Sequence, residues 1–454
     1  MSAFFAARAR LPEGWARDVR LEVDAGGAFA SVEPGGSPAG AERLDGWVLP
    51  GVPNLHSHAA QRALAGYAER AGPGEDSFWS WREAMYALVA QLDPSALETL
   101  ATDLYCEMLE GGYTSVCEFH YLHRAPDGSA YADPNETSER LVAAARASGI
   151  GLVLLPALYR FSDAGGVAPN ERQRRFVEEP ATFAARWRRL RDRYAGDPQI
   201  AIGLAAHSLR AVLPSDLSAL DALARERPEL PTPLHLHAAE QRREVAACAD
   251  AYGAPPIEVL AGSVALDERW CVVHATHATP PERELLARVG AVVALAPTTE
   301  ANLGDGIFAL REFAHLGGRF GIGSDAQLSL DPSEELRWLE YGQRLVHGAR
   351  ALLRDAQETS VGDYLFAGVL AAGAQASGRP IGRLAKGARA DLIAITPPDE
   401  REPSLDPLIF RSGTWRVRET LVGGRRLVRD GHHPLRERLQ PEVAAVVQRL
   451  TIKA

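Results

Sequence analysis

The feature that most constrains the fold is a series of eight short apolar runs between residues 52 and 324, separated by longer helical patterns. The runs cover 52–57, 114–120, 151–156, 199–205, 232–237, 270–275, 291–296 and 319–324. Most are continuous rather than alternating, as expected of strands buried on both faces of a parallel sheet. Helical patterns lie between them, for example over 94–110, 135–147, 180–194 and 280–289. Eight strands alternating with helices predict an α/β fold with a (β/α)8 barrel of the TIM type; an open doubly wound sheet is the alternative.

The two ends of the chain have a different pattern from this middle region. About 50 residues at the start and about 70 at the end are rich in short alternating apolar stretches, such as VRLEV (19–23) and ADLIAI (390–395). Both ends therefore predict short strands and turns.

Charge and composition exclude several classes of function. The 454 residues carry a formal net charge of −10 at pH 7, so the chain lacks the positive surface that nucleic acid or an anionic membrane attracts. No run approaches the ~18–20 apolar residues that cross a membrane, and the start is too short and too charged for a signal peptide. Cys106, Cys117, Cys248 and Cys271 form no Cys-x-x-Cys pair and predict free thiols in the cytoplasm.

Histidines gather where the predicted strands end. Nine of the chain's 13 histidines lie at or just after these runs, and the carboxyl ends of barrel strands are where such folds place their chemistry. His56 and His58 are two residues apart on one strand, so both point to the same side and can bind one ion. His237 and Asp325 would complete a His3Asp set around a divalent metal ion, zinc above all, with one coordination position left for water.

Glu240 and His274 are the candidates for proton transfer beside that ion. Glu240 follows His237 by three residues, near enough to exchange a proton with water without binding the ion. His274 lies near the end of the sixth run, where it could polarise the bond under attack or stabilise the developing charge.

Four motifs resemble those of the amidohydrolase superfamily: PGVPNLHSH (50–58), HLHAAE (235–240), VHATH (273–277) and GIGSDA (321–326). The resemblance covers essentially the whole chain. It implies a metal-dependent barrel over residues 50–375 and a small β-sandwich built from residues 1–49 and 376–454. The stretch 381–395 is similar to that family's return into the sandwich.

Within the superfamily, the His-x-x-Glu element is similar to that of the deaminase branch. Further segments are most similar to the N-formimino-L-glutamate deiminases of histidine degradation: 56–66, 77–86, 117–124, 203–212, 237–241 and 296–306. Ring deaminases of the branch usually carry Ser-Asn where this chain has Thr299-Glu300. The resemblance implies hydrolysis of N-formimino-L-glutamate to N-formyl-L-glutamate and ammonia.

The resemblance also assigns roles to individual residues. It implies that the zinc ligands are His56, His58, His237 and Asp325. It implies that Glu240, His274 and Asp325 are catalytic. Its substrate contacts carry over to Gln61, Arg82, Tyr121, His207 and Arg210.

The implied substrate has two carboxylates, which call for two cationic groups. Arginine binds a carboxylate through two parallel hydrogen bonds, so Arg82 and Arg210 are expected to hold opposite ends of the molecule. In the implied mechanism Glu240 and Asp325 accept the proton of the attacking water, and Glu240 passes one to the leaving nitrogen. His274 would stabilise the tetrahedral intermediate.

Two other functions remain open from the sequence. A deaminase of an aromatic ring such as guanine would use the same metal site with a flatter, apolar pocket, and would need no pair of arginines. A non-catalytic barrel protein is the second alternative, although such a protein would be expected to lose metal ligands that this chain retains.

The two lysines restrict the metal site. Neither Lys386 nor Lys453 lies on a predicted barrel strand, so a lysine-bridged pair of metals is excluded and one ion per chain is predicted. A bridge by another residue, such as Glu118, stays open. The same donors could bind iron, manganese or nickel, and a homodimer is expected from the resemblance. The sequence assigns no role to Glu300 or His277.

Overall fold

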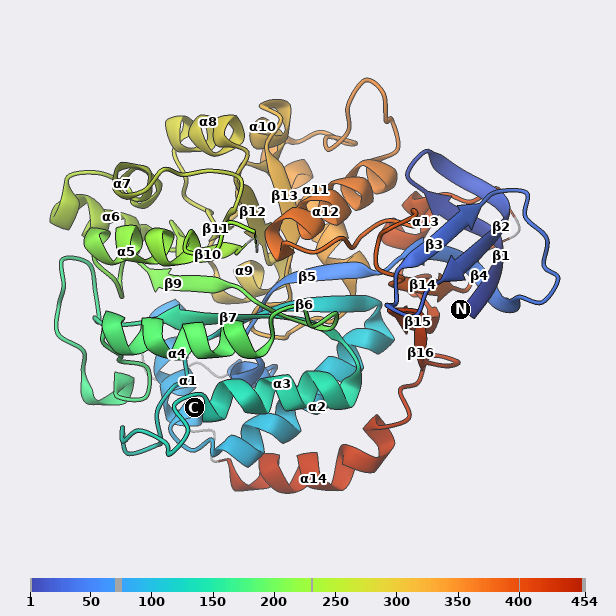
Figure 1. Cartoon of the computed structure of the whole chain (residues 1–454). Helices are drawn as coiled ribbons and strands as arrows, with labels where there is room; N and C mark the ends of the chain where they lie inside the picture. Colours follow the sequence, from blue (N-terminus) through green and yellow to red (C-terminus); the bar gives the residue numbers. More distant parts are fainter. Residues whose placement is uncertain (1, 70–75, 230–231, 400, 451–454) are drawn as a thin grey trace.

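The computed structural model describes residues 2–69, 76–229, 232–399 and 401–450 (Figure 1). Its larger part is a barrel of parallel strands surrounded by helices. Its smaller part, at the right of Figure 1, is a sheet to which both ends of the chain contribute strands.

The barrel confirms the predicted alternation of strands and helices. Its strands are β5 (Val52–Ser57), β6 (Tyr113–His120), β7 (Gly151–Leu158), β8 (Ile200–Ile202), β9 (Leu204–Ser208), β10 (Leu234–Ala238), β11 (Trp270–His274), β12 (Val292–Leu295) and β13 (Arg319–Ile322). They neighbour one another in the order β5-β6-β7-β9-β10-β11-β12-β13, with β8 also paired to β7, and every pairing is parallel. The fourth predicted run forms two short strands, β8 and β9, so eight positions complete the ring.

The first and last strands meet through backbone contacts at one end. The peptide N–H of Asp325 donates to the carbonyl of His56 (2.9 Å), and the N–H of His58 donates to the carbonyl of Asp325 (3.1 Å). Gly323 is required at this seam, because a Cβ atom there would lie 2.8 Å from backbone atoms of His56. The seam nearly closes the barrel and brings Asp325, which follows β13, next to His56 and His58 at the end of β5.

Helices cover the outside of the barrel and fill its connections. They are α1 (Phe78–Val89), α2 (Pro94–Gly111), α3 (Glu136–Ser148), α4 (Pro180–Arg193), α5 (Pro214–Ala224), α6 (Arg242–Tyr252), α7 (Pro256–Ser263), α8 (Pro280–Val289), α9 (Pro297–Leu303), α10 (Leu310–His315), α11 (Pro332–His347) and α12 (Val361–Ser377). Short 3-10 turns lie at Ala59–Leu64 and Glu171–Gln173. Several helices begin with a cap followed by proline: Asp93 accepts the N–H of Ala96 before α2, and Thr279 accepts that of Glu282 before α8.

The second sheet combines both ends of the chain, as expected for the small β-sandwich. Its strands are β1 (Ser2–Leu11), β2 (Gly14–Val23), β3 (Phe29–Glu33), β4 (Glu42–Pro50), β14 (Leu392–Ile395), β15 (Val417–Val422) and β16 (Arg425–Val428). Strand β4 pairs with both β1 and β14, and the sheet has an apolar cluster of its own that includes Phe4, Leu21 and Leu392. The exact boundaries of the two domains stay a prediction.

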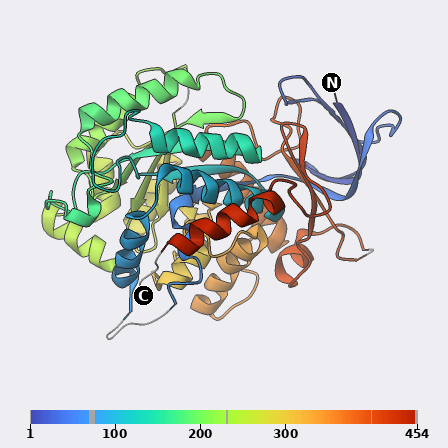
Figure 2. The same cartoon turned by 90° about the horizontal axis from the view of Figure 1, so that it is seen from below.

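The C-terminal helices lie in different surroundings. Helix α13 (Leu405–Phe410) packs on α11 and α12, and α14 (Arg436–Arg449) returns to the barrel and packs on α2 (Figure 2). Within the described ranges, no helix has the length and apolar character needed to cross a membrane.

Candidate active site

The predicted functional residues lie together at the carboxyl end of the barrel strands. His56 belongs to β5, His237 to β10 and His274 to β11, while Asp325 follows β13. All four side chains are buried, with at most 5% of each residue exposed. The structure therefore gathers residues that lie up to 269 positions apart in the sequence.

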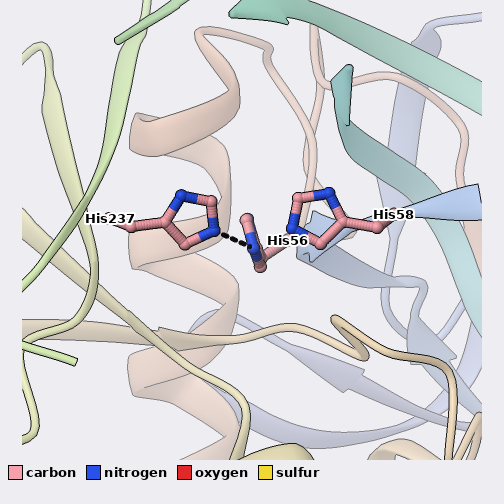
Figure 3. Close-up of side chains that lie close together, drawn as sticks. All are labelled: His56, His58 and His237. Carbon is pink, nitrogen blue, oxygen red and sulfur yellow. Dashed lines mark hydrogen bonds between the residues drawn. The ribbon is translucent and has the colours of Figure 1, made fainter. Parts of the chain in front are cut away.

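Three histidines and one aspartate present their ligand atoms to one another. The Nε2 atoms of His56 and His237 are 3.0 Å apart, and Figure 3 shows the ring of His56 between those of His58 and His237. Asp325 Oδ1 lies 3.3 Å from His56 Nε2 and 3.4 Å from His58 Nε2. This is the set of four residues that the sequence predicts as metal ligands.

The second ring nitrogens show that these donors fit a cation. His58 Nδ1 donates to the carbonyl of Phe119 and His237 Nδ1 donates to the carbonyl of His207, both at 2.9 Å. A carbonyl only accepts hydrogen bonds, so each Nδ1 bears the hydrogen and each Nε2 presents a lone pair to the cluster. Burial and the neighbouring His58 lower the pKa of His56 to about 3, which keeps its imidazole neutral. Lone pairs and a carboxylate that converge in this way suit one divalent metal ion.

The backbone around the site is strained. Ala239, His274, Ala275, Asp325 and Gln327 have φ between +44° and +67°, and they are five of the eight non-glycine residues with positive φ in the described chain. Each such residue costs roughly 1–3 kcal/mol unless its surroundings hold it. The strand ends thus turn sharply where the side chains of the site leave them.

Three carboxylates surround His274. Its Nε2 lies 3.8 Å from Glu240 Oε1 and 3.8 Å from Asp325 Oδ2, and its Nδ1 lies 3.1 Å from Glu300 Oε1. Burial lowers the pKa of His274, but the carboxylates outweigh burial and raise that pKa to about 10. The three carboxylates thus favour a protonated His274 ring. The contact with Glu300 was not foreseen, because nothing in the local pattern of 296–306 indicates which side chain this carboxylate meets.

Arg210 and Glu240 form a buried ion pair that the sequence did not predict. Arg210 Nη2 donates to Glu240 Oε2 at 2.7 Å, and the two residues are 6% and 4% exposed. The predicted substrate anchor is thus in direct contact with the predicted proton carrier. Glu240 Oε1 remains free of this pair and faces His274.

All five predicted substrate contacts line one pocket with Glu240 and the histidines. They are Gln61, Arg82, Tyr121, His207 and Arg210. Gln61 Nε2 donates to the hydroxyl of Tyr121 (3.2 Å). The sequence missed the aromatic walls, which include Phe78, Trp81, Tyr86, Tyr159 and Phe176; clustering of aromatic residues in 77–86 was their one available signal.

Arg82 is the most available cation of this pocket. Its guanidinium carbon lies 4.6 Å from the centre of the Trp79 ring and 5.6 Å from that of Tyr86. Its Nε atom is buried and has no hydrogen-bond partner in the part of the chain that the structure describes. Arg82 as a whole is half-buried, and a guanidinium with one buried, unused donor is suited to an anionic group of a ligand.

Residues left open by the sequence lie outside the ligand cluster. Glu118 accepts hydrogen bonds from Ser57 Oγ and the N–H of Ala59, both at 2.7 Å, and burial raises its pKa to about 8. Neither Glu118 nor His277 belongs to the groups of metal-ligand atoms found among the described residues. Lys386 lies in the loop before β14, and Lys453 lies outside the described residues.

Comparison with known proteins adds evidence from outside this chain. The sequence model of the amidohydrolase family matches residues 47–427, and that of the formimidoylglutamate deiminase HutF N-terminal domain matches residues 1–46. Formimidoylglutamate deiminase of Pseudomonas aeruginosa is 50% identical over 444 residues, which cover 96% of this chain and 97% of that protein.

Two further relatives are more general. A 5-methylthioadenosine/S-adenosylhomocysteine deaminase of Halobacterium salinarum is 30% identical over 454 residues, covering 96% of this chain and 93% of that protein. The crystal structure of an amidohydrolase from Brucella melitensis is 42% identical, with a TM-score of 0.93 over 99% of this chain and 100% of that one.

Replacing one proposed ligand tests the metal site. We expect His237→Ala to lose most of its bound divalent metal, because one of four donors is removed. Elemental analysis of the purified folded protein measures this. His235→Ala is the matched control: His235 lies on the same strand, but its Nε2 bonds the carbonyl of Ala376 (2.9 Å). Equal metal contents in the two variants would contradict the assignment.

Proposed function

The chain belongs to the amidohydrolase family, and on that premise we propose that it hydrolyses N-formimino-L-glutamate to N-formyl-L-glutamate and ammonia, a step of histidine degradation. The similarity to formimidoylglutamate deiminase of Pseudomonas aeruginosa, at 50% identity, supports this reaction. The observation within the site that carries it is the pair Arg82 and Arg210 in the pocket that also contains Glu240 and the histidine cluster. Two guanidinium groups match a substrate with two carboxylates.

We propose that one zinc ion is held by His56, His58, His237 and Asp325. Three imidazoles and a carboxylate are an N/O donor set that zinc favours, and such an ion lowers the pKa of water and polarises the group under attack. Elemental analysis identifies the metal: a native protein carrying iron or manganese instead would overturn the choice of zinc but not the site.

Glu240 transfers the protons of the reaction, and His274 donates a hydrogen bond. Glu240 Oε2 is bound by Arg210, so Oε1 is the atom that accepts a proton from the attacking water. The oxygen of that water bonds to the formimino carbon, and its two protons end on the nitrogen that leaves as ammonia, with Glu240 as their carrier. His274 Nε2–H donates to the developing negative charge.

The two arginines hold the substrate in different ways. Arg210 retains N–H groups beyond the one bound to Glu240, so it can bind a substrate carboxylate and keep its ion pair. Arg82 contributes a donor that is unused in the pocket. Aromatic side chains form part of the walls of the same pocket.

The exposed face of α11 supports a homodimer. Trp338, Tyr341, Leu345 and Val346 are 40%, 37%, 75% and 60% exposed, and their spacing places them along one face of the helix. We expect Leu345→Glu to shift the chain from dimer to monomer in analytical ultracentrifugation. Val167→Glu, at a residue 52% exposed and outside α11, is the control. A monomeric wild type would refute this assembly.

The cytoplasm is the proposed location. The four cysteines are free and buried, which suits a reducing compartment. Fractionation of cells that produce the protein tests this, and recovery outside the cytoplasm would contradict it.

Ammonia release from N-formimino-L-glutamate tests the function directly. We expect release from this compound but not from guanine, because a neutral ring gives Arg82 and Arg210 no carboxylate.

Glu240→Gln should retain its metal and lower kcat by about 100-fold or more, since the proton carrier is removed while the ligands stay. Near-normal turnover of this variant would show that the proton takes another route.

Arg82→Met tests the second carboxylate contact. Loss of a charge-assisted hydrogen bond of about 1.5–3 kcal/mol should raise KM by roughly 10–100-fold. Arg243→Met is the matched control, because Arg243 also stacks on Trp79, at 4.3 Å, without lining the pocket. A similar KM for both variants would mean that Arg82 acts through its packing and not through the substrate.

A further inference from the structure

Glu300 has no role in the proposed mechanism, yet it contacts His274, which has one. It belongs to the first turn of α9 and is 5% exposed. Its Oε1 lies 3.1 Å from His274 Nδ1, the nitrogen on the side of the ring away from Glu240. This contact determines how the imidazole can be used.

A carboxylate at this distance fixes the state of Nδ1. An ionised carboxylate only accepts hydrogen bonds, so the hydrogen of the pair is on His274 Nδ1. The opposite nitrogen, Nε2, then faces Glu240 Oε1 and Asp325 Oδ2, both 3.8 Å away. A ring rotated by half a turn would lose the contact with Glu300, so this contact determines the orientation of the His274 ring.

Glu300 is itself held in place. Its Oε1 accepts the N–H of Ala296 at 3.0 Å, and its own N–H donates to the carbonyl of Ala296 at 2.9 Å. The N–H of Asp305 donates to the carbonyl of Glu300 at 2.9 Å. His274 has a left-handed backbone with φ of +67°. Both partners of the contact are therefore constrained.

We propose that Glu300 is the positioning residue of His274, which it holds with Nδ1 protonated and Nε2 directed at the reacting group. Glu300 does not line the reaction pocket, whereas His274 does, so Glu300 acts through the ring and not on the substrate. This inference rests on the proposed hydrolytic reaction. Removal of the Glu300 carboxylate should affect the chemical step more than substrate binding.

Two substitutions separate the contact from the charge. We expect Glu300→Ala to lower kcat by about 10–100-fold, the usual effect of removing such a supporting hydrogen bond, with KM changed less than about threefold. Glu300→Gln should recover most of this loss, because its amide oxygen still accepts from both His274 Nδ1 and Ala296. Equal losses in the two variants, or a loss confined to KM, would overturn the proposal.

Glu335→Gln is a matched control for damage to α9. Glu335, on α11, is also a buried carboxylate. It accepts the N–H of Thr298 at 3.0 Å, and Thr298 lies in the turn of α9 that carries Glu300. We expect this variant to lower the thermal stability while leaving kcat within about threefold. If kcat falls as it does in Glu300→Ala, the effect of Glu300 belongs to the helix and not to His274.

A double-mutant cycle tests the route of action. If Glu300 works through His274, then Glu300→Ala should cost little further activity in a His274→Asn background. Additive losses would overturn the proposal.

A measurement without substrate keeps this test distinct from the proposed function. Nitrogen-15 NMR of labelled histidines, with the His274 signals assigned by their loss in His274→Asn, reports which ring nitrogen is protonated. We expect Nδ1–H in the wild type and in Glu300→Gln, and a changed signal in Glu300→Ala. An unchanged His274 signal in Glu300→Ala would overturn the proposal even if ammonia release were as expected, and the expected signals would survive a different substrate.

Discussion

The seam between the first and last barrel strands is the interaction on which the site depends. Reciprocal backbone hydrogen bonds join Asp325 to His56 and His58, so the bonds that close the barrel also set three of the four proposed ligands. Asn54 reinforces the seam, because its Oδ1 accepts the N–H groups of both Ser324 and His56. The contacts that close the barrel therefore also place these ligands, and a barrel that failed to close would not assemble the site.

The parts of this arrangement that repeat along the chain could be predicted, and those that depend on contacts between distant segments could not. Continuous apolar runs predict the barrel, and strand ends predict which side chains share its rim. The sequence HLH alone does not show that His237 reaches the cluster, whereas His235 bonds the carbonyl of Ala376 instead. The pairs Arg210–Glu240 and Glu300–His274 are likewise tertiary, since 30 and 26 residues separate their members.

Two ionised groups of the site, Glu240 and His274, have partners of opposite charge, whereas Arg82 has no carboxylate partner among the described residues. Glu240 is paired with Arg210, and His274 lies among three carboxylates. Arg82 stacks on aromatic rings and keeps a buried donor unused in the described structure, so it is the cation that a ligand carboxylate can satisfy. An acidic chain can therefore accept an anionic substrate, because local groups outweigh the net charge of −10.

We propose that the histidine and aspartate cluster binds one divalent ion on which hydrolysis of N-formimino-L-glutamate depends. Titration of zinc into metal-free protein, with ammonia release measured at each addition, is the decisive experiment. We expect activity to rise in proportion to added zinc and to reach its plateau at about one ion per chain. Full activity in the metal-free protein, or a plateau only at two ions per chain, would contradict it.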